Sequence, residues 1–222
     1  MTALARDEIT RGTAAEYRAF IELLAGLDAD QWSIPTRCDG WTVAHVAGHV
    51  TGQLDDVVNF RFDELSRPDS PEIQAARHRD HSPSEVAAEL ERLVETFEVA
   101  VGAFDDAAWD APIDESFGSQ TIGEGVHALW DDTYVHADDV RAALGREPER
   151  GPGMRAAILR LAQVLTEQEW RPATLVLDGV ERVEISGGGD EITGDPHEFV
   201  LVATGRADPA TFGLDETVNV YR

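Results

Sequence analysis

The sequence predicts an α+β fold in which a bundle of four long helices precedes a small α+β domain. Two observations lead to this prediction. Up to about residue 144, apolar residues recur every three or four positions in long segments, as they do in amphipathic helices. After Gly145 this pattern gives way to short alternating segments separated by turn residues. We therefore place the bundle in residues 1–150 and the second domain in residues 151–222.

Amphipathic periodicity marks the four bundle helices. The first spans residues 6–27, and the second runs from a cap at Thr42 to about Leu65, before Pro68 ends the pattern. Residues 28–40 between them are predicted as a loop. The third helix begins at the sequence Ser-Pro-Ser-Glu (82–85), which has the residue types of a capping box with proline at the first helical position. The fourth spans residues 122–144 and is closed by Gly145.

Short alternating segments predict the second domain. One helix, residues 153–168, leads into strands at 174–179, 181–186 and 191–194. A further helix begins after Asp195 and stops at Gly205. The tail at 217–222, TVNVYR, alternates as a final strand does. This region is therefore predicted to combine a small sheet with helices.

Charge and composition exclude several functions. The 18 basic and 43 acidic residues give a formal net charge of −25, which repels nucleic-acid phosphates and anionic membrane surfaces. The single cysteine, Cys38, excludes an internal disulfide framework, and we interpret it as structural. No apolar stretch reaches the roughly 18–20 residues of a membrane span, and the first residues are charged. We expect a cytoplasmic monomer or homodimer that binds neither nucleic acid nor membranes.

Two helices carry residues that can bind a metal ion. Asp132 and His136 are four apart, so they share one face of the fourth helix, beside its apolar stripe. On the second helix, His49 follows His45 by four and lies at the edge of the apolar face. Two imidazoles and a carboxylate form an open zinc-type ligand set, which nickel or iron would also accept. The alternatives are an ion pair on a solvated helix face for Asp132 and His136, a place in the first turn of its helix for His45, and a satisfied core histidine for His49.

Three segments resemble one protein family. WTVAHVAGHVTG (41–52), YVHADDVRAALG (134–145) and FVLVATGRADP (199–209) are similar, in this order, to the mycothiol-dependent maleylpyruvate isomerase family, a branch of the DinB-like metal-binding bundles. The resemblance implies a DinB-like four-helix bundle in which His49, Asp132 and His136 bind a divalent metal, usually zinc. The family's glutamate is Asp132 here. Its side chain is one methylene shorter, which predicts a weaker site, a shifted backbone or a lost site.

The resemblance also makes Asp139 and Arg206 candidate catalytic and cofactor-binding residues. Asp139 follows His136 by three and would accept a hydrogen bond from a metal ligand or contact the thiol cofactor. Its alternative role is an ion pair with Arg141 or Arg146 on the helix surface. Arg206 would hold a substrate carboxylate through two parallel hydrogen bonds, or else bind carbonyl groups at the end of its helix.

Together with the ligand pattern, the resemblance implies a metal-dependent enzyme that uses mycothiol. Its substrate would be a small electrophile or a dicarboxylate resembling maleylpyruvate, and its reaction an isomerisation or an S-transfer. Two alternatives have the same ligands: a non-catalytic metal-binding or regulatory bundle, and a metal-dependent hydrolase. Trp32 and Trp41 are interpreted as anchors that hold the loop on the bundle rather than as ligand-stacking residues.

Overall fold

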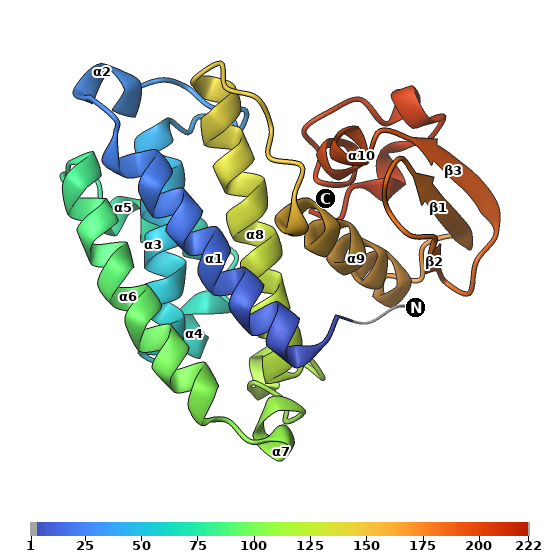
Figure 1. Cartoon of the computed structure of the whole chain (residues 1–222), viewed down its shortest axis with the longest axis horizontal. Helices are drawn as coiled ribbons and strands as arrows, with labels where there is room; N and C mark the ends of the chain where they lie inside the picture. The colour runs from blue at the N-terminus through green and yellow to red at the C-terminus, as the bar shows by residue number, and fades with distance from the viewer. Residues whose placement is uncertain (1–3, 222) are drawn as a thin grey trace. The chain divides into compact units, whose positions relative to one another are not determined.

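The computed structural model describes residues 4–221 and divides into two compact units (Figure 1). Arg6–Glu147 form the first unit, which is helical, and the chain from Pro148 onward forms the second, which contains a three-stranded sheet. The predicted fold class, a helical bundle followed by a small α+β region, is confirmed. The assignment of 1–150 and 151–222 as separate domains stays a prediction.

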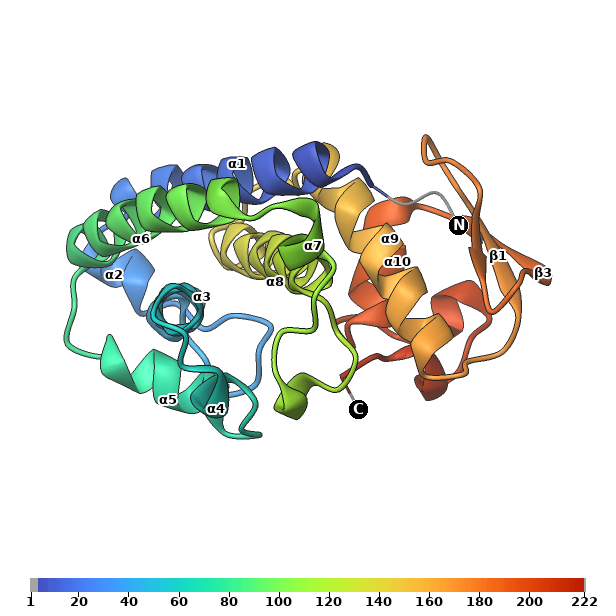
Figure 2. The ribbon, with the colours of Figure 1, turned by 90° about the horizontal axis from the view of Figure 1, so that it is seen from below.

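Four long helices make up the bundle unit: α1 (Arg6–Ala25), α3 (Val43–Val58), α6 (Pro83–Ala103) and α8 (Ile122–Ala143). α1 packs on α6 and α8, and α3 packs on the same two helices. Figures 1 and 2 both show α1 and α6 side by side. The core of this unit contains side chains that are at most 1 % exposed, among them Tyr17, Phe20, Leu90 and Phe97. Within residues 4–221 no helix is both long and apolar enough to cross a membrane.

The long helices begin where the sequence offers a cap. The Ser82 N–H donates to the Glu85 carboxylate at 2.8 Å, and Thr121 and Glu124 make the same pair at the start of α8. Both are capping boxes. At the start of α3, the backbone N–H of Thr42 donates to His45 Nδ1 at 3.2 Å. His45 is exposed and belongs to the first turn of its helix, as the alternative drawn for it from the sequence predicts.

The prediction of one helix from Thr42 to Leu65 is wrong. α3 ends at Val58, and α4 (Phe62–Leu65) follows after a turn. Phe60 in this turn has a φ of +56°, in the left-handed region, which ends the helix. The backbone N–H of Arg61 donates to Asp56 O at 2.8 Å and holds the turn closed. Other short helices lie in segments for which no helix is predicted: α2 (Ala29–Trp32), α5 (Ser70–Arg77), α7 (Asp106–Trp109) and η1 (Glu115–Phe117).

Two glycines allow α5 to pack closely on α3. A Cβ atom on Gly52 would lie 2.7 Å from the Cβ of Gln74, and one on Gly48 would lie 3.1 Å from Ala75 O. Because the two glycines are four residues apart, they lie on one face of α3. The close approach brings the Gln74 side chain within hydrogen-bond distance of His49.

The second unit places helices around a small sheet. Its strands β1 (Ala173–Leu177), β2 (Val183–Ile185) and β3 (Asp190–Gly194) follow the order β2-β1-β3. β1 is antiparallel to β2, with Thr174 opposite Glu184, and parallel to β3, with Leu175 opposite Ile192. The remaining elements are α9 (Pro152–Glu167), α10 (Pro196–Ala203), η2 (Pro209–Phe212) and η3 (Glu216–Val218), and α9 packs on both β2 and α10.

The predicted final strand at 217–222 is wrong for the residues that the structure describes. The Asp215 side chain accepts from the Thr217 N–H at 2.9 Å and starts η3 instead. Val218 is fully buried, and the Val220 N–H donates to Ala203 O at 3.0 Å. This segment therefore packs against the end of α10. The valine alternation reflects this packing rather than strand pairing. Arg222 lies outside the described residues.

Candidate metal centre

α3 and α8 bring His49, Asp132 and His136 together. Asp132 Oδ2 lies 3.5 Å from His49 Nε2, and Asp132 Oδ1 lies 3.7 Å from His136 Nε2. One ligand atom from each residue lies within 4.8 Å of the other two. Ligand atoms about 2.0–2.2 Å from a tetrahedral zinc ion lie roughly 3.3–3.6 Å apart, whereas direct hydrogen bonds are shorter than about 3.2 Å. The spacing therefore suits a shared cation better than direct hydrogen bonds.

The second nitrogen of each histidine fixes how its ring presents Nε2. His49 Nδ1 lies 2.8 Å from Gln74 Oε1, and His136 Nδ1 lies 3.1 Å from Asp139 Oδ2. Amide and carboxylate oxygens only accept, so each Nδ1 carries a proton and each ring turns its Nε2 toward Asp132. A cation between each Nε2 and the Asp132 carboxylate, either a proton or a metal ion, stabilises this arrangement. Metal-bound histidines in proteins are oriented by this kind of Nδ1 hydrogen bond.

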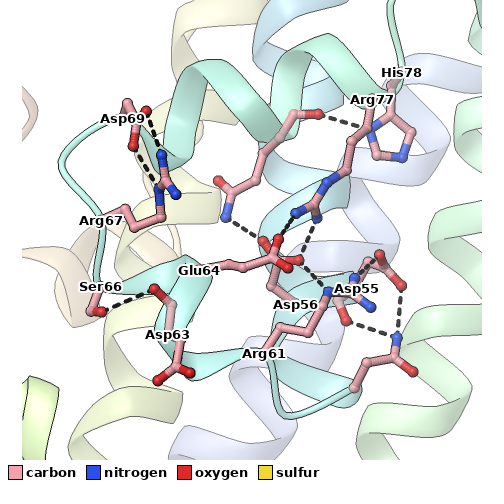
Figure 3. Close-up of polar contacts among 12 residues, drawn as sticks. Asp55, Asp56, Arg61, Asp63, Glu64, Ser66, Arg67, Asp69, Arg77 and His78 are labelled. Carbon is pink, nitrogen blue, oxygen red and sulfur yellow. Dashed lines mark hydrogen bonds and ion pairs between the residues drawn. The ribbon is translucent and has the colours of Figure 1, made fainter.

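Behind His49, a chain of hydrogen bonds ends in a buried carboxylate. Gln74 Nε2 donates to Asp56 Oδ2 at 2.9 Å, which fixes the orientation of the amide and leaves its oxygen for His49. Asp56 is fully buried, and both Arg61 and Arg77 donate to its other oxygen, as Figure 3 shows. The ion-pair cluster around Asp56 thus anchors the amide that orients His49.

The charge of Asp56 is maintained by its donors. Burial by itself would raise the pKa of this carboxyl, but hydrogen bonds from Gln74, Arg77 and Arg61 outweigh that effect. The pKa of Asp56 therefore lies below its ordinary value. Asp56 is ionised at neutral pH and acts as an acceptor for the Gln74 amide.

On α8, Asp139 gathers donors from the helix and from the loop before α3. It is 0 % exposed, and its Oδ2 accepts from His136 Nδ1 and from the Cys38 thiol, whose Sγ lies at 3.2 Å. Arg37 Nε lies 3.3 Å from its Oδ1. The surface-pair alternative with Arg141 or Arg146 is wrong, because the helix turns Asp139 inward. The Cys38 contact agrees with the structural interpretation of this cysteine.

Trp41 packs against the histidines of the candidate centre. The interpretation of Trp41 as a loop anchor does not predict this contact. The Trp41 ring centroid lies 5.4 Å from that of His49 and 6.4 Å from that of His136, to which the Trp41 ring is nearly parallel. The preceding turn is closed by the Trp41 N–H, which donates to Cys38 O at 2.9 Å, and it contains Gly40 with a φ of +78°. Trp32 does act as an anchor, because its Nε1 donates to His81 O at 3.1 Å.

Tyr17 on α1 supplies a neutral phenol to the core near Asp132. Burial raises the pKa of Tyr17 most, the nearby Thr133 side chain lowers it, and the negative charge of Asp132 raises it again. The net shift is upward, so the phenol stays protonated well above neutral pH.

The three candidate ligands differ in exposure. The Asp132 side chain is 21 % exposed, whereas the His49 side chain is 7 % exposed. Asp132 is therefore the most exposed of the three candidate ligands, since the His136 side chain is 11 % exposed.

Arg206 belongs to the second unit, where it follows the end of α10. Its Nη1 donates to Thr204 O at 3.1 Å, the kind of helix-end contact that one of its two alternatives describes. The structure thus brings His49, Asp132, His136 and Asp139 together within the bundle unit, and it places Arg206 in the other unit.

Sequence reasoning missed Gln74, Trp41 and Arg37. Gln74 lies on a helix that was not predicted, although two glycines four residues apart inside the second helix signal that another backbone approaches there. Trp41 directly precedes Thr42, the cap of α3. From this position its side chain can reach His49, which lies two turns into the same helix. No signal in the sequence marks Arg37.

Comparison with known proteins agrees with this arrangement. Residues 13–141, more than half of the chain, match the family described as Mycothiol maleylpyruvate isomerase N-terminal domain. The chain belongs to this family. It is 29 % identical over 153 residues to two uncharacterised proteins of Mycobacterium tuberculosis, MT0763 of strain CDC 1551 / Oshkosh and Rv0738 of strain ATCC 25618 / H37Rv; the match covers 69 % of this chain and 76 % of each relative.

Two crystal structures share the fold of this family member across both units. They are those of the mycothiol-dependent maleylpyruvate isomerase, at 19 % identity, and of a histidine-to-alanine mutant of that enzyme, at 18 % identity. Each superposes with a TM-score of 0.71 over 97 % of this chain and 98 % of the other. At this level of identity the likeness establishes the fold.

Proposed function

We propose that this protein is a metal-dependent enzyme that uses mycothiol or a similar low-molecular-weight thiol, as an isomerase or an S-transferase. One observation supports this most: two imidazoles, each with Nδ1 held by an acceptor, turn Nε2 toward the same carboxylate. His49, Asp132 and His136 would hold a divalent cation, most naturally zinc. The shorter side chain of Asp132 still brings one oxygen toward each histidine.

The residues of the chain would prepare the site for this chemistry. When bound, the cation and the thiol together supply a nucleophilic sulfur that stays deprotonated near neutral pH. Asp139 holds the His136 ring, and the Gln74 amide holds the His49 ring, so the ligand set is oriented in advance. Trp41 stacks nearly parallel to the His136 ring and meets the His49 ring edge to face, so it packs against both imidazoles.

The substrate would be a small electrophile or a dicarboxylate. The assignment of Arg206 to a substrate carboxylate rests on its match to the family motif and on the ability of a guanidinium to bind a carboxylate with two parallel hydrogen bonds. An isomerase acting on a dicarboxylate needs such a cationic anchor. An S-transferase acting on an uncharged electrophile does not, so the Arg206→Ala variant distinguishes the two reactions.

The test is turnover of maleylpyruvate and of an uncharged electrophile by the zinc-loaded protein, with and without mycothiol. We expect turnover that needs the thiol, is lost on chelation and returns with zinc. Arg206→Ala would reduce turnover of maleylpyruvate more than that of the uncharged electrophile. Chelator-sensitive activity without any thiol would indicate a hydrolase instead, and a zinc-loaded protein with no turnover in either assay would contradict the proposal.

A further inference from the structure

His78, His81 and Glu89 form a second cluster of metal-ligating side chains, where α5 leads into α6. His78 caps the C-terminal end of α5, His81 follows in the connecting loop, and Glu89 lies in the second turn of α6. One ligand atom from each lies within 4.8 Å of the other two. We propose that this cluster is a second divalent-cation site, of the zinc type, that ties the end of α5 to α6.

The distances in this cluster match those between ligands of one ion. His78 Nε2 lies 3.5 Å from Glu89 Oε1, and His81 Nδ1 lies 3.8 Å from Glu89 Oε2. Both are too long for hydrogen bonds and lie near the roughly 3.3–3.6 Å between ligand atoms of a tetrahedral zinc ion. The two imidazole rings meet edge to face with centroids 5.4 Å apart. The carboxylate thus faces both rings without bonding directly to either.

The hydrogen bonds of the histidines leave nitrogens available to an ion. His78 Nδ1 donates to Gln74 O at 3.0 Å, so the His78 ring turns its Nε2 toward Glu89. His81 Nδ1 is buried from solvent, and among residues 4–221 no hydrogen bond reaches it. A buried nitrogen beside a carboxylate oxygen is stabilised when a cation lies between them. The Nδ1 bond of His78 to a carbonyl is the usual support of a metal-bound histidine.

The backbone around His81 is already fixed in this arrangement. Its N–H donates to His78 O at 3.0 Å, and its C=O accepts from Trp32 Nε1 at 3.1 Å. Ser82 then starts α6 with a capping box. The His78 side chain is 4 % exposed and the His81 side chain 41 %, so the site is rigid on one side and open to solvent on the other. An ion can therefore enter and complete its coordination with water.

Gln74 connects this cluster to the candidate metal centre. Its backbone oxygen binds His78, while its side-chain oxygen binds His49. A change that shifts the backbone at Gln74 would therefore disturb both sites, whereas a change of its side chain alone leaves the oxygen that binds His78 in place. His81 and Glu89 offer cleaner probes, because their contacts lie within the second cluster and its loop.

The test is zinc titration of the full, untagged chain against a chromophoric chelator, with unfolding temperature as a second readout. The variants are His81→Ala and Glu89→Gln, and the control is His45→Gln, which removes an exposed histidine but keeps a capping-box residue type. We expect His81→Ala to bind one zinc ion fewer than the wild type, and Glu89→Gln to bind the second ion at least about tenfold more weakly. His45→Gln should behave as the wild type.

The result does not depend on the proposed function. If the centre of His49, Asp132 and His136 binds no zinc, the wild type still binds one ion, and His81→Ala binds none. Zinc should also raise the unfolding temperature of His49→Ala and not that of a variant with both His49→Ala and His81→Ala. Equal zinc stoichiometry and affinity in the wild type and in folded His81→Ala and Glu89→Gln would overturn the proposal.

Discussion

The two histidines of the candidate metal centre are supported in different ways. His136 binds a carboxylate, Asp139, three residues further along its own helix. His49 binds a neutral amide, Gln74, which lies 25 residues away and is itself anchored by Asp56. A carboxylate draws the Nδ1 proton more strongly than an amide does, so it makes the opposite nitrogen a stronger metal ligand. In the proposed metal site the α8 side would therefore set ligand strength, whereas the α3 side would mainly set position.

Removing the carboxylate that both sides share should have the largest effect. Asp132→Ala takes away a ligand and leaves two imidazoles without their common partner. We expect zinc affinity to fall by more than about 100-fold, beyond the range for residues that only support ligands. Isothermal titration with zinc measures this loss.

Asp132→Glu is the matched control for that variant. It restores the length of the family's carboxylate at a side chain that is partly exposed. Affinity should stay within about tenfold of the wild type. A loss as large as that of Asp132→Ala would show that the helices are spaced for the shorter side chain alone.

Asp139→Asn tests the stronger of the two supports. The substitution keeps the shape of the side chain but removes the charge that faces His136, Arg37 and Cys38. We expect zinc affinity to fall about 10- to 100-fold. The same titration with folded protein checks it, and unchanged affinity would show that His136 needs no carboxylate.

Gln74→Leu tests the weaker support. The His49 Nδ1–H loses its acceptor, although the packing of α5 on α3 retains a side chain of similar size. The expected loss of zinc affinity is about tenfold, at the lower end of the range for such supports. A larger loss than that of Asp139→Asn would reverse the comparison between the two sides.

Asp56→Asn should affect stability more than zinc affinity. Because the pKa of Asp56 is lowered in the folded state, its ionised form stabilises the fold above the ordinary aspartate pKa of about 3.9, and this stabilisation is lost as the pH falls through the lowered value. The variant should lose about 1–3 kcal/mol of unfolding free energy at pH 7, with a smaller difference from the wild type in more acidic solution. Urea unfolding with a chelator present, at pH 7 and near pH 3.5, measures both values; a difference independent of pH would contradict the account.

The sequence predicts local features of this protein well. Apolar periodicity and capping residues such as Ser82 and Thr121 locate the starts of the long helices within about one residue. Asp132 and His136 are four residues apart, and His136 and Asp139 are three apart. Because residues at these spacings lie on one face of a helix, all three side chains point into the site. The α8 side of the candidate centre is therefore predictable from sequence.

Features that depend on distant contacts are not predictable in this way. The helix that carries Gln74 is short and gains its place from packing against Gly48 and Gly52 rather than from strong periodicity. The left-handed turn at Phe60 interrupts a pattern that otherwise continues to Leu65. The α3 side of the candidate centre is assembled by these contacts, and so its support is visible only in the structure.

The most direct test of the central claim is the zinc content of the centre measured without the second cluster. The comparison is His81→Ala with the double variant His49→Ala, His81→Ala, both untagged, loaded with zinc, desalted and analysed for metal, with folding checked by circular dichroism. The account predicts close to one zinc ion per chain in the single variant and none in the double variant. Equal zinc content in the two folded proteins, or none in either, would contradict it.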